Sequence, residues 1–514
     1  MRIRSLAPLA PLAALALVSP AHATVALPSG FGDHVVVSGL DQPTAFAFLP
    51  DGRALVTEQV TGAIRLVIGG SLSPTPLATV SGLSINGGER GLLAIAVDPG
   101  WPVRPYVYVH ATVTGNKMRL IRYTATGTLT GATSFDLALG SPYIVLDNLA
   151  DLASNHNGGA LRFGTDGRLY YSLGDDADGC QAQDSTTLHG AVLRLDVSGL
   201  PAGAGGPPAR TALVPADNPW SGGANVNAQL EWAYGLRNPF RFVVDSATGQ
   251  LFLSDVGEST WEELDQITPG FNGGWPFREG PVVYTGASCS EPGGVGTGVY
   301  DPPIDSYDHG EGYVIIAAGV IRPGAGSAWP AAWDGNVLYA DYYTGFMRMI
   351  GRVSGTWQRI TAPGQPDPDH FATGLPTPVD FGWGPDGDLY WLAQYDESGQ
   401  PRTGELHRIH AGDPASARSG PAPVTAALVA SPNPAREGVS LRYALPRDGA
   451  TRLTVLDIGG RVVARLADGY VTAGWHVAPW DGHGPDGRPA PAGVYLARLE
   501  SPAGVVTTRL IRLR

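Results

Sequence analysis

The stretch Asp166-Gly167-Arg168-Leu169-Tyr170-Tyr171 joins a tight turn to a short apolar strand. Similar segments, each with Asp or Gly before a short apolar run, recur at intervals up to residue 391. Six runs share this pattern: Ala54–Val56, Tyr106–Val109, Leu169–Tyr171, Leu251–Leu253, Val337–Tyr339 and Leu389–Trp391. Asp and Gly favour turns, and each run covers one face of a sheet but cannot form a core alone. Six copies therefore predict six sheet units.

The composition favours the same architecture. The chain of 514 residues contains 70 Gly and 44 Pro, and only 16% of its residues are charged, so it has little material for long helices. Short strands joined by many turns are expected instead. Stacking such sheets in a ring buries their apolar faces and protects their edges. We predict an all-β fold whose large part, residues 24–411, is a six-bladed β-propeller.

The N-terminus has the order of a secretory signal. A charged start, Met1 to Arg4, precedes an apolar run from Leu6 to Val18 and the small-residue site Ala21-His22-Ala23. We expect residues 1–23 to be cleaved and the protein to be periplasmic, secreted or attached to the cell surface; a disordered apolar N-terminus is the alternative. No later segment offers the roughly 18 apolar residues of a membrane span, so no transmembrane segment is expected.

Charge and cysteine content limit the partners. The chain carries 34 basic and 47 acidic residues, a net charge of −13, which disfavours nucleic acid and other polyanions. Cys180 and Cys289 are the two cysteines. In an exported protein they pair or remain as two free thiols, and the sequence leaves both readings open.

A linker and a second unit follow the propeller. Residues 412–424 are rich in small residues and Pro, which is typical of a linker. Residues 425–514 predict a small β-sandwich with six strands: 441–445, 453–458, 462–466, 475–480, 494–499 and 505–513.

The motifs of this unit are 431–434 (SPNP), 457–462 (DIGGRV), 480–482 (WDG), 491–496 (PAGVYL) and the basic end 509–514. With them the unit resembles the immunoglobulin-like domains of the hook-capping and secretion-sorting type. The resemblance implies secretion or cell-surface machinery as a partner; a spacer sandwich is the alternative.

Further motifs arrive in a fixed order in the first 411 residues. They are 88–93 (GERGLL), 155–159 (NHNGG), 174–175 (GD), 182–184 (AQD), 235–239 (GLRNP), 257–263, 272–276 (NGGWP), 302–322 and 341–342. This ordered set resembles the glucose/sorbosone dehydrogenase family of quinoprotein β-propellers. The resemblance implies oxidation of a sugar hydroxyl, with hydride transfer to bound pyrroloquinoline quinone.

His156 is the leading catalytic candidate. It lies in a polar loop flanked by Gly, where an imidazole can accept a proton near neutral pH; an ordinary loop histidine is the alternative. The resemblance implies that His156 takes the proton of the sugar hydroxyl and that Arg237 stabilises negative charge on the quinone. An arginine paired with a carboxylate is the other reading of Arg237. The cofactor-binding residues implied are Glu89, Asn155, Asn238 and Gly257.

Acidic residues near these loops predict Ca²⁺ binding, because carboxylate oxygens are the ligands that Ca²⁺ prefers. The resemblance implies that the carbonyls of Gly257 and Glu258 face a cofactor calcium, and that Glu262 and Glu263 hold a structural one. Solvated acidic loops are the alternative reading.

The sequence also departs from the quinone-binding pattern. Residues 341–345 (DYYTG) and 376–382 (PTPVDFG) lack the lysine and the arginine pair of quinone-binding members, and Glu89 stands where those members have glutamine. In this the chain is similar to the branch that includes the hedgehog-interacting protein. Two functions therefore stay open: a quinone-dependent aldose dehydrogenase, and a non-catalytic propeller that binds glycans or proteins. Metal-dependent hydrolysis ranks last, because no clustered His/Asp ligand motif is present.

Overall fold

The fold is all-β, as predicted. A computed structural model describes residues 25–291, 298–324, 327–396, 399–412 and, with short gaps, 427–513. The predicted signal at 1–23 and nearly all of the predicted linker at 412–424 lie outside the described residues. The described residues contain strands β1 to β35 and one short α-helix, α1 (Val226–Leu230). No helix among them is long and apolar enough to cross a membrane.

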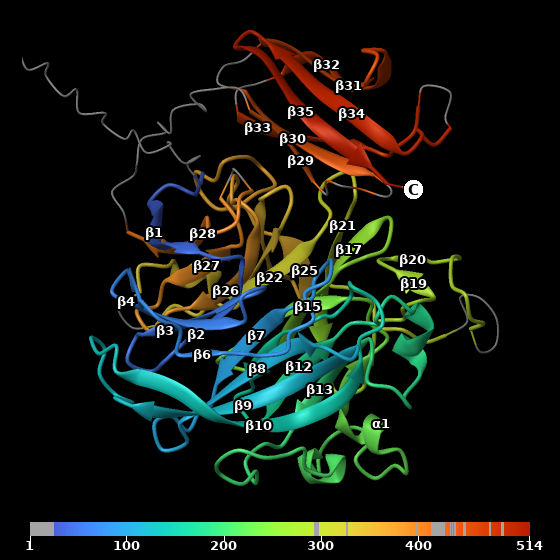
Figure 1. Cartoon of the computed structure of the whole chain (residues 1–514). Helices are drawn as coiled ribbons and strands as arrows, with labels where there is room; N and C mark the ends of the chain where they lie inside the picture. The colour runs from blue at the N-terminus through green and yellow to red at the C-terminus, as the bar shows by residue number, and fades with distance from the viewer. Residues whose placement is uncertain are drawn as a thin grey trace, which may run out of the picture.

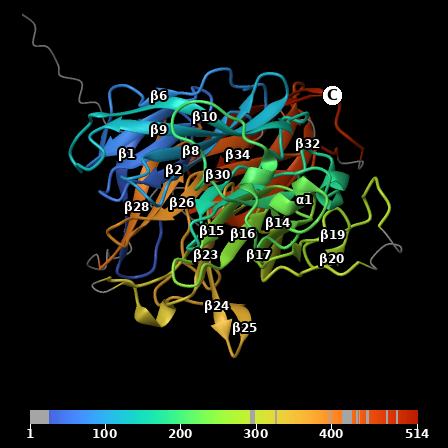
Figure 2. The same cartoon turned by 90° about the horizontal axis from the view of Figure 1, so that it is seen from below.

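Six sheets follow one another along the first part of the chain, and their labelled strands can be followed in Figure 1 and Figure 2. The first three consist of β2 (Pro43–Phe48), β3 (Ala54–Glu58), β4 (Ala63–Ile68), β5 (Ser71–Leu72) and β6 (Ala78–Thr79); β7 (Leu92–Val97), β8 (Tyr106–Val113), β9 (Lys117–Gly127) and β10 (Leu137–Ala150); and β11 (Leu161–Phe163), β12 (Leu169–Leu173), β13 (Ala191–Leu195), β14 (Glu231–Tyr234) and β18 (Phe271–Asn272).

The next three sheets consist of β15 (Pro239–Val244), β16 (Leu251–Asp255), β17 (Trp261–Ile267) and β21 (Asp305–Asp308); β22 (Ile315–Val320), β23 (Val337–Asp341), β24 (Met347–Val353) and β25 (Thr356–Arg359); and β26 (Pro378–Trp383), β27 (Leu389–Ala393), β28 (Gly404–Ala411) and β1 (Phe31–Leu40). Each of the six apolar runs found in the sequence lies in the second strand of a different sheet. The turn before each run therefore marks the first hairpin of its sheet.

The first strands of the six sheets form a closed ring. Strand β2 contacts β7, β7 contacts β11, β11 contacts β15, β15 contacts β22, β22 contacts β26, and β26 contacts β2. Strand β1, from the start of the chain, completes the last sheet by pairing with β28, from Phe31 opposite Ala411 to Leu40 opposite Gly404. The two ends of this part of the chain therefore hold each other in one sheet.

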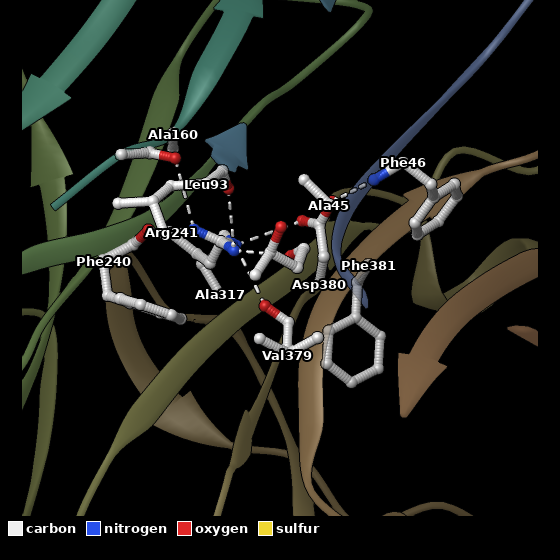
Figure 3. A network of polar contacts seen from close by, with 12 residues as sticks. Ala45, Phe46, Leu93, Ala160, Phe240, Arg241, Ala317, Val379, Asp380 and Phe381 are labelled. Atoms are coloured by element: carbon white, nitrogen blue, oxygen red, sulfur yellow. Dashed lines mark hydrogen bonds and ion pairs between the residues drawn. The ribbon is translucent and has the colours of Figure 1, made fainter. Parts of the chain in front are cut away.

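A single guanidinium lies where the first strands meet (Figure 3). The buried Arg241 side chain donates hydrogen bonds to five backbone carbonyls that belong to or adjoin five first strands: Thr44 (2.6 Å), Leu93 (3.5 Å), Gly159 (3.3 Å), Phe240 (2.8 Å) and Val379 (2.9 Å). Asp380 lies 3.5 Å away and also accepts from Arg162 at 2.6 Å. Burial lowers the pKa of Arg241 to about 10, against the raising effect of Asp380, so the side chain is charged at neutral pH.

A histidine secures the join between β1 and β28. His407 Nδ1 lies 2.8 Å from Asp33 Oδ2 and its Nε2 lies 3.2 Å from Glu405 Oε2, while its ring stacks on Trp391 at 4.0 Å. The Trp391 indole donates to the same Asp33 at 2.8 Å. Burial alone would lower the pKa of His407, but the two carboxylates raise it to about 9.

Cys180 and Cys289 form a disulfide with a Cα separation of 5.9 Å, which settles the pairing that the sequence left open. Cys180 belongs to a short 3-10 helix, Gly179–Gln183, between β12 and β13. Cys289 follows the hairpin of β19 (Arg278–Glu279) and β20 (Val282–Val283). The bond therefore joins two long loops that leave different sheets.

The C-terminal residues form two further sheets. One contains β29 (Ala427–Ser431), β30 (Val439–Leu445) and β33 (Gly474–Trp480), and the other contains β31 (Gly449–Asp457), β32 (Val462–Val471), β34 (Gly493–Ser501) and β35 (Gly504–Arg512). Buried side chains from both sheets, including Leu441, Leu453, Trp480 and Leu499, share one core. The six strands predicted for this unit correspond to β30 to β35.

The raised pKa of His407 predicts a pH-dependent stability. A histidine normally titrates near pH 6.5, so its protonated form contributes fully below that pH, and the contribution falls as pH rises and is lost above about pH 9. We expect His407→Gln to lower the free energy of unfolding strongly at pH 6 and much less at pH 9.5. Urea denaturation of both proteins at both pH values measures this, and a destabilisation that is equal at the two pH values would contradict the assignment.

The disulfide should stabilise the fold through the long loop that it closes. The two cysteines are 109 residues apart, and a loop of that length corresponds to a stabilisation of up to about 5 kcal/mol in the chain-entropy model. The double variant Cys180→Ser with Cys289→Ser should lose stability of this order in urea denaturation, and reduction of the parent protein should reproduce the loss. Superimposable unfolding curves would show that the bond constrains nothing.

Candidate functional site

His156 lies in the loop between β10 and β11, and local glycines allow its position. Its own φ is +59°, in the left-handed region, and Gly158 and Gly159 also have positive φ. A Cβ on Gly174 would come within 2.0 Å of the His156 carbonyl oxygen. Only glycine at 174 therefore lets the end of β12 approach the histidine loop this closely.

Asp175 orients the His156 ring. His156 Nδ1 lies 2.7 Å from Asp175 Oδ1, and both side chains are almost fully buried. The other carboxylate oxygen of Asp175 accepts a hydrogen bond from the Trp275 indole at 2.7 Å. Because the carboxylate accepts from Nδ1, the proton of a neutral ring sits on Nδ1, and Nε2 is left as the proton acceptor. The pair has the geometry of an oriented general base.

Arg237 is fixed beside this pair by its backbone and its side chain. Its carbonyl accepts from Asp175 N at 2.8 Å, and the backbone N–H groups of Arg237 and Asn238 donate to Asp255 at 2.8 and 2.7 Å. Burial raises the pKa of Asp255 to about 7 despite these two hydrogen bonds. The Arg237 guanidinium donates to the Val256 carbonyl at 3.0 Å and forms an ion pair with Glu258.

Glu89 and Asn238 connect the loops beneath the histidine. Asn238 Nδ2 donates to Glu89 Oε1 at 3.0 Å, and Glu89 Oε2 accepts from Asn157 N at 3.1 Å. Asn238 Oδ1 accepts from Gly158 N at 3.1 Å. These two predicted cofactor-binding residues therefore hold the histidine loop and do not line the cavity described next.

A cavity of about 480 Å³ opens above these residues. Four predicted residues line it, namely Asn155, His156, Arg237 and Glu258. Gly257 does not line it; a Cβ on Gly257 would come within 1.7 Å of the Trp261 carbonyl, so this glycine allows a tight backbone turn. The rest of the lining consists of Asp175, Ala177, Gly179, Cys180, Trp275, Pro276, Tyr284, Gly286, Ala287 and Ser288.

The aromatic wall of the cavity was not predicted. Trp275 and Tyr284 lie with ring centroids 4.9 Å apart, and glycines fit against both: a Cβ on Gly179 would meet the Trp275 indole at 2.8 Å, and one on Gly286 would meet the Tyr284 hydroxyl at 2.4 Å. Trp275 belongs to the motif 272–276, so its sequence signal was present without a role. The disulfide and the hairpin of β19 and β20 bring the loop of Tyr284 to the cavity.

The two glutamates predicted to share a calcium do not converge. Glu262 and Glu263 are neighbours on β17, and neighbouring strand side chains point to opposite faces. Glu262 contacts His309 Nε2 at 3.0 Å and accepts from Ile315 N at 3.0 Å, whereas Glu263 accepts from Gly280 N. Within the described ranges, no three His, Cys, Asp or Glu side chains are grouped as a metal site.

Comparison with known proteins places this geometry in a family. Residues 40–345 match the family model described as glucose/sorbosone dehydrogenase. The chain is 33% identical over 258 residues to the HIPL2 protein of Arabidopsis thaliana, and this alignment covers 47% of the chain and only 35% of that protein. It is 27% identical over 277 residues to the aldose sugar dehydrogenase YliI of Escherichia coli, covering 54% of this chain and 70% of the relative.

A solved structure is similar to this chain in both fold and sequence. The crystal structure of an oxidoreductase (glucose dehydrogenase) of Thermus thermophilus superposes with a TM-score of 0.56 and 27% identity, covering 74% of this chain and 100% of that one. The family match includes the loops of His156, Asp175, Arg237 and Trp275. The chain belongs to the glucose/sorbosone dehydrogenase family.

Proposed function

We propose that the cavity binds a sugar and that His156 accepts the proton of one of its hydroxyl groups, the proton-transfer half of a sugar dehydrogenase reaction. The observation that carries this is the 2.7 Å contact between His156 Nδ1 and Asp175, which leaves Nε2 as the acceptor on a ring that lines the cavity. Family membership supports a sugar hydroxyl as the group that loses the proton.

The other lining residues have distinct roles in this proposal. Asn155 offers an amide to hydrogen-bond the hydroxyl groups of the sugar, and Trp275 holds Asp175 in place. The faces of Trp275 and Tyr284 offer an apolar wall of the kind that packs against a sugar ring. Arg237 lies on the cavity wall as the ion-pair partner of Glu258, so it would stabilise negative charge that develops during the reaction only when this pair opens.

We also propose the wider organisation that the sequence predicts. The six sheets are the blades of a six-bladed β-propeller, and the two C-terminal sheets are an immunoglobulin-like sandwich that serves secretion or attachment to the cell surface. The closed contacts of β2, β7, β11, β15, β22 and β26 support the propeller, and the shared apolar core supports the sandwich. Export through residues 1–23 completes the proposal.

The hydride half of a dehydrogenase reaction needs an acceptor, and the residues present do not fit pyrroloquinoline quinone. That molecule carries three carboxylates, which need fixed cations in a buried site. Among the described residues that line the cavity, Arg237 is the one Lys or Arg, and Glu258 already pairs with it. We therefore assign no step to the quinone.

The two stretches that lack the family cations have structural roles here. Buried Asp341 accepts backbone hydrogen bonds from Tyr313, Val314, Tyr343 and Thr344 at 2.6 to 2.9 Å, so it organises a turn. Asp380, in the second stretch, pairs with Arg162 and Arg241. These observations favour a second candidate function, a propeller that binds glycans or proteins without redox chemistry.

Turnover and binding assays separate the two candidate functions. Purified protein is assayed with an aldose panel, Ca²⁺, pyrroloquinoline quinone and an artificial electron acceptor, and sugar affinity is measured by calorimetry. If the chain oxidises sugars, His156→Ala should lower kcat by two orders of magnitude or more, because the base is lost, while the sugar Kd changes little. His410→Ala, a half-exposed histidine paired with Asp388 outside the cavity, is the matched control.

If a sugar binds but no mixture gives turnover, the dehydrogenase hypothesis is rejected and the non-catalytic binding function is supported. Sugar binding that is absent altogether, or turnover that His156→Ala leaves intact, would contradict the role given to His156. Arg237→Ala in the same assays tests whether its charge contributes to the rate.

We propose that Ca²⁺ binds at Glu263 together with Asp265. The two alternate with Leu264 on β17, so they share one face, and Asp265 is fully buried with no hydrogen bond to either carboxylate oxygen. Burial, together with the charges of Glu263 and Asp255, raises the pKa of Asp265. A cation would compensate these carboxylates, with backbone carbonyls or water as further ligands. The calcium expected at Gly257 and Glu258 is a cofactor calcium that accompanies the quinone, and the cavity does not fit the quinone. Glu262 already pairs with His309.

Calcium should therefore raise the melting temperature, because it binds the folded state alone. Calorimetric melting in chelator and in millimolar Ca²⁺ should differ for the parent protein. The difference should shrink greatly in Asp265→Asn and persist in Asp369→Asn, an exposed control in a turn between β25 and β26. Equal melting temperatures of the parent protein with and without Ca²⁺ would overturn the site.

A further inference from the structure

The cavity wall carries more negative than positive charge, which disfavours the binding of an anionic ligand. Among the described residues that line the cavity, the side chains of fixed charge are Asp175, Arg237 and Glu258, two carboxylates and one cation. With His156 neutral, the formal charge of these groups is −1. Both carboxylate oxygens of Asp175 are engaged, one with His156 and the other with Trp275. A charged ligand would therefore meet the ion pair of Arg237 and Glu258 instead.

Arg237 cannot easily serve a second anion. Its side chain is only 9% exposed, one terminal nitrogen donates to the Val256 carbonyl, and the other pairs with Glu258. The guanidinium also lies 5.6 Å from the centroid of the Trp275 ring. A ligand carboxylate could reach this cation only after Glu258 moved away.

Glu258 is the accessible partner of the pair. Its side chain is 41% exposed and lines the cavity. Its backbone is held in place, because the N–H groups of Glu258, Ser259 and Thr260 all donate to Glu279 Oε1 at 2.7 to 3.0 Å. The carboxylate is therefore presented to the ligand on a fixed loop while it neutralises Arg237.

We infer that Glu258 makes the cavity selective for uncharged sugars and excludes sugar acids and other carboxylates. An anionic ligand would meet the Glu258 carboxylate and find Arg237 already neutralised, so it would lose hydration without gaining a partner. A neutral sugar meets no such penalty, because its hydroxyl groups can donate to Glu258 and Asn155. Selection against the wrong ligand by a like charge is a general way of achieving specificity. This inference rests on the proposed sugar function and names its substrate class.

The test exchanges the charge of Glu258 and keeps its shape. Glu258→Gln still accepts a hydrogen bond from Arg237 but leaves the guanidinium charge for the ligand. The matched control is Glu311→Gln, whose carboxylate is 42% exposed and pairs with the buried Arg348 outside this cavity. Calorimetry with glucose and glucuronate gives the ratio of their affinities for each protein, and thermal melting verifies that each variant is folded.

We expect the parent protein to bind glucose and to bind glucuronate at least ten times more weakly. Glu258→Gln should shift the ratio toward glucuronate about tenfold or more, since a charge-assisted hydrogen bond becomes available, and Glu311→Gln should not. A parent protein that binds both sugars equally, or an unchanged ratio in Glu258→Gln, would overturn the inference.

A second probe separates this inference from the proposed function. Pyrroloquinoline quinone, titrated by its absorbance, should bind Glu258→Gln more tightly than the parent protein whether or not a sugar binds. If no sugar binds but the quinone gains affinity in Glu258→Gln, the proposed function fails and the role of Glu258 stands. If the quinone affinity is also unchanged, the role of Glu258 fails too.

Discussion

The buried guanidinium of Arg241 joins the first strands of the ring at their common centre. Sheets arranged in a ring leave backbone carbonyls of their first strands facing a common centre, and those groups need partners once they are buried. Arg241 supplies one charged donor group for carbonyls next to or within five of the six first strands. Asp380 balances its charge and also accepts from Phe46 N at 3.1 Å. Residues separated by more than 300 positions in the chain are thereby held around one side chain.

This centre also positions the cavity. Gly159, whose carbonyl accepts from Arg241, follows His156 by three residues, and Gly158 is held by Asn238 from the start of the next sheet. Asn238 in turn binds Glu89, which fixes the backbone of Asn157. The histidine loop is thus held by Arg241 and Asn238 of the β15 region and by Glu89 before β7, while the disulfide joins two loops that supply other lining residues. Such a cavity is rigid by construction, which suits a base that must keep one orientation.

Much of this could be predicted from local sequence. The turn before each apolar run marks a hairpin, because the conformational preferences of Asp and Gly act within a few residues, and each run proved to be the second strand of a sheet. The loop position of His156 was also legible. What the sequence could not show depends on contacts between distant residues: the carboxylate that orients His156, the Trp275 indole that holds this carboxylate, and the pairing of Arg237 with Glu258. Glu262 and Glu263 are the opposite case: they are adjacent in the sequence, but neighbouring side chains in a strand point to opposite faces of the sheet.

The site therefore combines an oriented histidine with a cavity that is poor in positive charge. The first property is what a sugar dehydrogenase needs, and the second argues against a tightly held quinone tricarboxylate. Together they lead us to place a neutral sugar in the cavity, in contact with His156. A crystal structure of the protein with a bound neutral aldose would reveal where the sugar lies. We expect a sugar hydroxyl oxygen within hydrogen-bonding distance of His156 Nε2, with the sugar between Glu258 and Tyr284. A sugar bound elsewhere, or in the cavity but remote from His156, would overturn this placement.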